Sequence, residues 1–124
     1  MNRLRILKSH PIIIVPVLIL ALLSCSKNSD KQDHYVNTPI AGFTYTGNDG
    51  PAPVTIRFYN TSSNADQFEW DFGDGYTSTD HDPSHTYHNS TNEVKTFLVI
   101  LKATDSSSGL FQRQSKSIAV QPGG

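Results

Sequence analysis

Cysteine and long apolar runs are both scarce in this sequence of 124 residues. The only cysteine is Cys25, so an internal disulfide is excluded and side-chain burial must stabilise the folded part. The longest apolar run, Ile12 to Leu23, has 12 residues and is interrupted by Pro16. Because crossing a bilayer takes about 20 apolar residues, the run is too short for the alternative of a transmembrane anchor helix.

Acidic residues are absent from the first 24 positions, where we predict a secretory signal peptide. Arg3, Arg5 and Lys8 precede the apolar run and a small residue follows it, an order typical of such signals. The exit "LLSC" resembles the bacterial lipobox, which implies cleavage and acylation at Cys25. A leftover free thiol is the alternative, but an exported thiol is open to oxidation. Each buried methylene contributes about 0.8 kcal/mol, so acyl chains there form a stable membrane anchor.

Basic residues are outnumbered in the part after the predicted cleavage site. That part has 100 residues, with seven basic and eleven acidic side chains and a net charge of −4. This balance argues against nucleic acid and anionic lipid as the main partners. Residues 25–39 are polar and lack an apolar period, so after the lipidated cysteine we expect a flexible tether. Ser26 resembles the sorting residue of lipoproteins sent to the outer membrane of Gram-negative bacteria.

A helical period of 3.6 is missing from residues 40–121, where apolar residues alternate instead. In "VTIRFYN", Val54, Ile56 and Phe58 fall on one face of a strand. The same alternation marks four further stretches, at 43–45, 68–72, 97–103 and 118–120. Turn-forming residues separate these stretches, which predicts an all-β, immunoglobulin-like antiparallel β-sandwich of about seven strands. The alternation does not determine which strands pair. After the last strand we expect a disordered tail at 122–124.

The stretch "WDFGDG", residues 70–75, predicts a strand that ends in a tight reversal. Trp70 is the only tryptophan, and on a middle strand it would fill the space between two sheets. Phe72 would end the strand facing inward. We therefore expect both side chains in the core.

The aspartates and glycines of this stretch suit a turn better than a ligand site. Gly73 and Gly75 can take the positive φ that a short hairpin needs, and Asp71 and Asp74 can accept bonds from nearby amides. A phosphate cradle needs a helix after the glycines, and an EF-hand needs a closing glutamate; neither follows here. Calcium is kept as an alternative, on the clustered carboxylates of Asp71, Asp74, Asp80 and Asp82.

Three stretches together resemble the PKD domain, a β-sandwich named for the polycystic kidney disease protein. They are "FEWDFGDG" at 68–75, "DPSHTY" at 82–87 and "KTFLVILKATD" at 95–105. The first is complete, whereas Asp82, Phe97 and Ala103 replace the residues common in the family. The resemblance covers 40–120 and implies a binding or spacing role, with protein or carbohydrate contacts. No cofactor is expected.

The "HTY" stretch carries the remaining residues of the motif, which we expect to be structural. Carboxylates of the preceding segment can orient His85 by a hydrogen bond. Tyr87 is expected to pack inward, as a tyrosine corner does in related sandwiches. A hydrolase triad of Ser84, His85 and Asp82 is disfavoured, because neighbours in sequence cannot reach the geometry that a triad requires. We therefore predict no catalytic residue.

Several outward positions are apolar, which predicts a contact surface. Leu98 and Ile100 occupy outward positions where the family usually has threonine, and Tyr59 and Phe111 are also expected to face outward. On one sheet these side chains would form an apolar patch, unless the tether or a terminal segment covers it. Tyr59 and Tyr76 can also stack on sugar rings. A second hypothesis is an accessory subunit that docks on an outer-membrane complex through Leu98 and Ile100.

Overall fold

The structure, a computed structural model, describes residues 37–124. The predicted signal peptide, the lipidation site and most of the tether lie outside the described residues. Within residues 37–124 there are seven strands and no helix, and therefore no helix that could cross a membrane. The strands are β1 (Phe43–Thr46), β2 (Val54–Asn60), β3 (Gln67–Asp71), β4 (Thr77–Ser78), β5 (Ser84–Tyr87), β6 (Lys95–Thr104) and β7 (Phe111–Val120).

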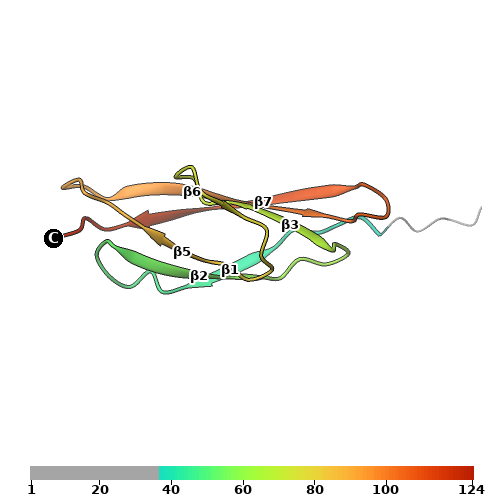
Figure 1. The fold of residues 1–124 in the computed structure, drawn as a ribbon, viewed down its shortest axis with the longest axis horizontal. Coiled ribbons are helices and arrows are strands. Elements are labelled where there is room, and N and C mark those ends of the chain that lie inside the picture. Colours follow the sequence, from blue (N-terminus) through green and yellow to red (C-terminus); the bar gives the residue numbers. More distant parts are fainter. Residues whose placement is uncertain (1–36) are drawn as a thin grey trace, which may run out of the picture. The chain divides into compact units, whose positions relative to one another are not determined.

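The strands form two antiparallel sheets that lie face to face (Figure 1). One sheet has three strands in the order β1-β2-β5, and the other has four in the order β4-β3-β6-β7. The predicted immunoglobulin-like sandwich of about seven strands is confirmed. Strand order, which alternation leaves open, follows from the register: β6 is central because it pairs with β3 on one side and β7 on the other.

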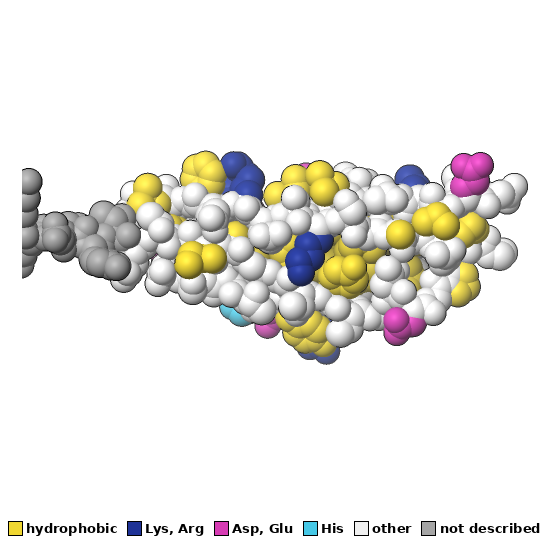
Figure 2. All heavy atoms as spheres, turned by 180° about the vertical axis from the view of Figure 1, so that it is seen from behind, with side chains coloured by type: hydrophobic (Ala, Val, Ile, Leu, Met, Phe, Trp, Pro, Cys, Tyr) yellow, Lys and Arg dark blue, Asp and Glu magenta, His cyan; other side chains and the backbone are white. Residues whose placement is uncertain are grey.

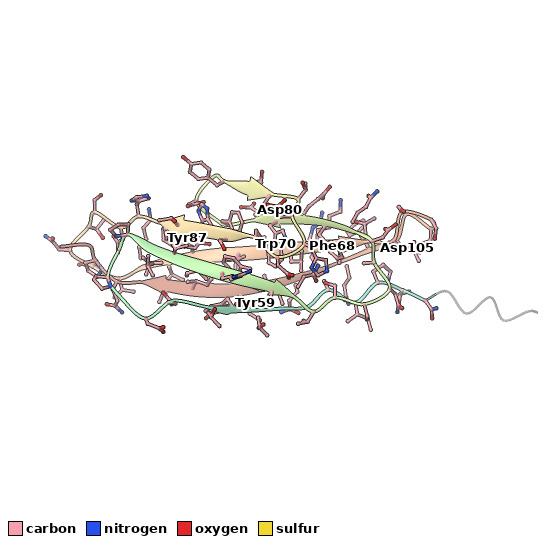
Figure 3. The ribbon with its side chains drawn as sticks, turned by 60° about the horizontal axis from the view of Figure 1, so that its bottom comes forward. Tyr59, Phe68, Trp70, Asp80, Tyr87 and Asp105 are labelled. Carbon is pink, nitrogen blue, oxygen red and sulfur yellow. The ribbon has the colours of Figure 1, made fainter. Side chains whose placement is uncertain are left out.

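The inward positions of both sheets meet in one aromatic core. Trp70 on β3 is 1% exposed, and its ring centroid lies 5.2 Å from that of Phe43 and 5.6 Å from that of Phe58. Trp70 and Tyr87 lie between the two sheets, as predicted (Figure 3). The buried cluster comprises Phe43, Ala52, Val54, Ile56, Phe58, Trp70, Phe72, Tyr87, Phe97, Val99, Leu101, Ile118 and Val120.

The β6–β7 hairpin is longer than the apolar alternation indicated. Its pairing runs without a break from Lys95↔Val120 to Thr104↔Phe111. The first half of β7 has glutamines rather than apolar residues at its inward positions, so the period-2 signal begins only near Ile118. One of them, Gln112, accepts a hydrogen bond through Oε1 from the backbone N of Ala41, at 2.8 Å. Gln112 itself is exposed, so this side chain bonds the backbone ahead of β1 instead of entering the core.

Both ends of the described chain are tied to the body. Pro39 is buried, and Asn64 Nδ2 donates to the Thr38 carbonyl at 3.2 Å, so ordered contacts begin before residue 40. At the other end, the backbone N of Gly123 donates to the Asn89 carbonyl at 2.9 Å. The segment 122–124, which we expected to be a disordered tail, therefore contains one residue with a backbone hydrogen bond to the sandwich.

Candidate functional site

The "WDFGDG" stretch forms a three-residue reversal between β3 and β4. The backbone N of Phe72 donates to the Tyr76 carbonyl at 3.0 Å, which closes the loop. Gly73 and Gly75 have φ angles of 77° and 96°, the positive values that the sequence predicts. Asp71 Oδ1 accepts from the Gly73 amide at 2.9 Å, and Asp74 Oδ1 accepts from the Tyr76 amide at 3.2 Å. Both carboxylates therefore stabilise the turn by accepting hydrogen bonds from its backbone amides.

His85 joins this reversal to the other sheet. Its Nε2 lies 2.7 Å from Asp74 Oδ2, which confirms that a nearby carboxylate orients the ring. The imidazole also stacks on the Phe72 ring, with a centroid distance of 4.3 Å and an interplanar angle of 6°. Because His85 lies on β5 and Phe72 follows β3, the contact stabilises the packing of one sheet on the other.

Tyr87 makes a second link between the sheets. Its hydroxyl donates to the Phe72 carbonyl at 3.0 Å, and its side chain is fully buried. Burial, with smaller contributions from the negative charges of Asp74 and Asp71, raises the pKa of the Tyr87 phenol far above its ordinary value of about 10. The residue is therefore held neutral, as a structural donor.

We expect the stability of the domain to fall at alkaline pH because of Tyr87. The folded state disfavours the phenolate, so this contribution is complete below pH 10 and is lost as the pH rises above it. Tyr87→Phe should flatten the change in unfolding free energy between pH 8 and pH 11, and cost about 1–2 kcal/mol at pH 7. The measurement is urea unfolding at both pH values. Tyr76→Phe, at an exposed tyrosine, is the control; an equal flattening there would contradict the assignment.

The alternatives of a calcium site and a catalytic triad find no matching geometry. In residues 37–124, no group of three or more His, Cys, Asp or Glu side chains is placed to hold a metal. Asp82 accepts from the backbone N of Asn60 at 2.8 Å and lies 3.1 Å from His81, whereas His85 contacts Asp74. Alternation along β5 also places Ser84 and His85 on opposite faces of the strand.

The outward side chains of the four-stranded sheet form what we call the β6 face. Leu98 and Phe111 are half exposed on it, at 49% and 51%, and Ile100 is partly exposed. Tyr59 lies on β2, in the other sheet, so the prediction of one patch that includes it is wrong (Figure 3). Tyr76 precedes β4 and is 67% exposed. The apolar residues thus share one face only in part.

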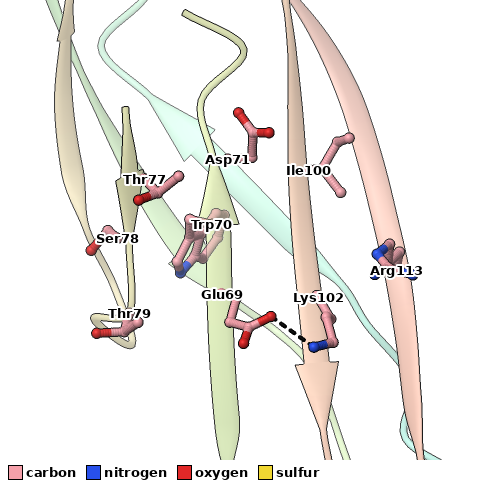
Figure 4. A pocket seen from close by; sticks show the side chains of 9 residues that line it. All are labelled: Glu69, Trp70, Asp71, Thr77, Ser78, Thr79, Ile100, Lys102 and Arg113. Atoms are coloured by element: carbon pink, nitrogen blue, oxygen red, sulfur yellow. Dashed lines mark hydrogen bonds and ion pairs between the residues drawn. The ribbon is translucent and has the colours of Figure 1, made fainter. Parts of the chain in front are cut away.

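The β6 face contains an open groove of about 380 Å³. Cross-strand register places Glu69, Lys102 and Arg113 in one row across β3, β6 and β7, with Ile100 beside them (Figure 4). Hydroxyl groups of the β4 segment line the opposite side. The lining residues are Glu69, Trp70, Asp71, Thr77, Ser78, Thr79, Ile100, Lys102 and Arg113.

Charge and aromatic surface are combined at the β7 side of the groove. Lys102 Nζ lies 2.8 Å from Glu69 Oε2. The guanidinium carbon of Arg113 lies 4.7 Å from the centroid of the exposed Phe111 ring, and Lys102 Nζ lies 5.2 Å from it. On the side of the described body seen in Figure 2, hydrophobic side chains lie beside separate basic ones rather than in one large patch.

Sequence reasoning missed Glu69, Lys102 and Arg113 as groove residues. They lie 33 and 11 positions apart along the chain, and only the register of three strands places them in a row. Their outward positions could be read from alternation, but their alignment could not. No local motif therefore identifies the groove.

Comparison with known proteins identifies the domain. The PKD domain model matches residues 37–120. The PKD1 domain of Vibrio anguillarum Epp aligns with a TM-score of 0.56 and 24% identity, over 69% of this chain and 96% of that one. The PKD1 domain from Vibrio cholerae metalloprotease PrtV aligns with a TM-score of 0.55 and 27% identity, over 68% and 98% of the two chains.

A third similar structure comes from work on carbohydrate-binding modules of the β-sandwich superfamily. It aligns with a TM-score of 0.58 and 26% identity, over 68% of this chain and 35% of that one. No curated protein matches the sequence significantly. The family match covers more than half of the chain and coincides with the β-sandwich, its hairpin motif and its buried tryptophan. The chain therefore belongs to the PKD domain family.

Proposed function

We propose that this protein is a non-catalytic lipoprotein of the bacterial cell envelope whose PKD domain binds polysaccharide through the β6 face. A lipid on Cys25 would hold it in the membrane, and the polar tether would present the sandwich outward. The motif aspartates and His85 are engaged in turn and packing contacts, which supports a role in binding rather than in catalysis.

The observation that carries this proposal is the mixed chemistry of the groove. Phe111 offers an exposed ring on which the apolar face of a sugar can stack. Phe111 does not itself line the groove but lies beside Arg113 and Lys102, which do. Hydroxyl and charged side chains of β3, β4 and β6 line the groove, where they can bond sugar hydroxyls. The structural similarity to a protein studied for carbohydrate-binding modules supports the same reading.

Phe111→Ala should weaken polysaccharide binding by about fivefold or more, since truncating an aromatic on which the ligand stacks costs more than about 1 kcal/mol. The test is calorimetry of the mature protein against a polysaccharide panel. Tyr59→Ala is the matched control, because Tyr59 is an exposed aromatic on the opposite sheet. Equal losses in the two variants, or no binding by the wild type, would contradict the proposal.

A second candidate function rests on Leu98, whose apolar side chain is half exposed on the same face. In this alternative the domain is an accessory subunit that docks on an outer-membrane complex through Leu98 and Ile100. The two functions predict different binding partners for the protein purified from its membrane. A protein partner that is lost in Leu98→Lys, together with flat polysaccharide titrations, would favour the accessory subunit.

A further inference from the structure

We infer that the groove of the β6 face selects an anionic polysaccharide, one whose sugar units carry carboxylates, with Arg113 as the carboxylate-binding residue. The inference deepens the proposed function and rests on it. It follows from which charged groups in the groove form an ion pair and from where the unpaired ones lie.

Two of the four charged side chains in the groove neutralise each other. Glu69 and Lys102 form an ion pair at 2.8 Å. Asp71 accepts a hydrogen bond from the Gly73 amide, but an amide is a neutral donor, so Asp71 keeps its negative charge. Among the described residues, no carboxylate lies within 4.0 Å of Arg113, the fourth charged residue. Arg113 is therefore the groove cation without an ion pair, and it lies on β7, with β6 between it and the charged Asp71 on β3.

The position of Arg113 suits a ligand carboxylate. Its guanidinium carbon lies 4.7 Å from the centroid of the Phe111 ring, and such a contact restrains the side chain. A guanidinium presents parallel N–H donors that match the two oxygens of a carboxylate. A sugar ring stacked on Phe111 would hold its carboxylate near this fork, while its hydroxyl groups face the polar side of the groove.

Register makes the positive charge local. The row Glu69, Lys102 and Arg113 has one acid and two cations, so it has a net positive charge on a mature chain of net charge −4. An anionic polymer is therefore attracted at the Lys102–Arg113 end of this row, whereas Asp71 on β3 repels it at the other side of the groove. We expect binding that weakens with salt and that depends on this one row.

The other sheet supplies a matched control. Arg57 on β2 also lies over an exposed aromatic, with its guanidinium carbon 5.7 Å from the Tyr59 ring centroid. Arg57 and Tyr59 do not line the groove. If stacked arginines attracted polyanions without a groove, both positions would matter equally.

The experiment uses the mature, acylated protein in detergent and measures binding to polygalacturonate, alginate and hyaluronan. Each polymer is tested beside its carboxyl-reduced form, which removes the charge and keeps the sugar backbone. We expect binding to at least one charged form, and at least about tenfold weaker binding to its reduced form. Arg113→Gln should bind the charged polymer more weakly by the same factor, and Arg113→Lys should recover part of this affinity. Arg57→Gln should bind like the wild type. Thermal unfolding confirms that each variant is folded.

Each other outcome overturns the inference in an identifiable way. Equal binding of charged and reduced polymers would leave polysaccharide binding intact but remove the role of the carboxylate. An equal loss in Arg57→Gln would show unspecific attraction. Equal binding of poly-L-glutamate would point to acidic peptides instead of sugars. No binding to any of these charged polymers would refute the inference. If neutral polysaccharides also failed to bind, the proposed function would be refuted too.

Discussion

Trp70→Ala is expected to lower the free energy of unfolding by about 3–5 kcal/mol, the range for removing a large aromatic from a packed core. Trp70 is 1% exposed and contacts the rings of Phe43 and Phe58 on the facing sheet. Its Nε1 also donates to the Asp80 carbonyl at 2.9 Å. The substitution therefore leaves a cavity and an acceptor without its donor. Small domains have about 5–15 kcal/mol of stability, so the loss is a large share of the total.

Urea unfolding measures this effect. Circular dichroism is the signal to follow, because the variant lacks the only tryptophan and so has no tryptophan fluorescence. Trp70→Phe is the control, since it keeps an aromatic ring and loses chiefly the donation to Asp80. It should cost less than the alanine variant. If Trp70→Ala cost under about 1 kcal/mol, the tryptophan would not be the centre of the core.

Gly73→Ala is expected to be the second most destabilising change, at about 3–5 kcal/mol. Gly73 has a φ of 77°, and an added Cβ would lie 2.5 Å from the Leu98 carbonyl oxygen and 2.9 Å from the Leu98 amide nitrogen. These are backbone atoms of the central strand β6, so they cannot shift without disturbing its pairing with β3 and β7. Conformational strain and steric overlap therefore add.

Gly75→Ala separates the two causes. Gly75 has a φ of 96°, but an added Cβ would meet no atom within 4 Å. Only the strain of a positive φ applies, so we expect a cost of about 1–2 kcal/mol. The difference in urea midpoints between the variants measures the close approach of the reversal to β6. Equal costs would show that backbone conformation alone requires both glycines.

Much of the fold could be predicted from particular residues. The alternation of Val54, Ile56 and Phe58 indicated β2 with its observed bounds, because one face of that strand is buried and the other is exposed. The limits of β7 could not be predicted. Its first half has Gln112 and Gln114 at inward positions, and its pairing to β6 overrides the missing apolar signal. Strand limits here depend on hydrogen bonds to a neighbour, which local sequence does not encode.

The hairpin could be predicted from local sequence, whereas the groove could not. The hairpin is local: Asp71, Gly73 and Asp74 lie within four positions, so their turn chemistry could be predicted and is observed. The pairing of Asp74 with His85 was expected only in outline, as a carboxylate near an imidazole. The groove draws on four strands, and the assignment of Tyr59 to the same patch failed because strand alternation does not say which sheet a strand joins.

The sequence by itself determined the class of fold, the turn at Gly73–Gly75, the inward tryptophan and the expectation of export. These features depend on neighbouring residues, through side-chain period, backbone freedom and the order of basic and apolar segments. Only the tertiary structure decided that Glu69, Lys102 and Arg113 form one row and that Tyr59 lies on the opposite sheet. The physical reason is that strand order and register arise from long-range pairing, which gathers residues that are distant along the chain.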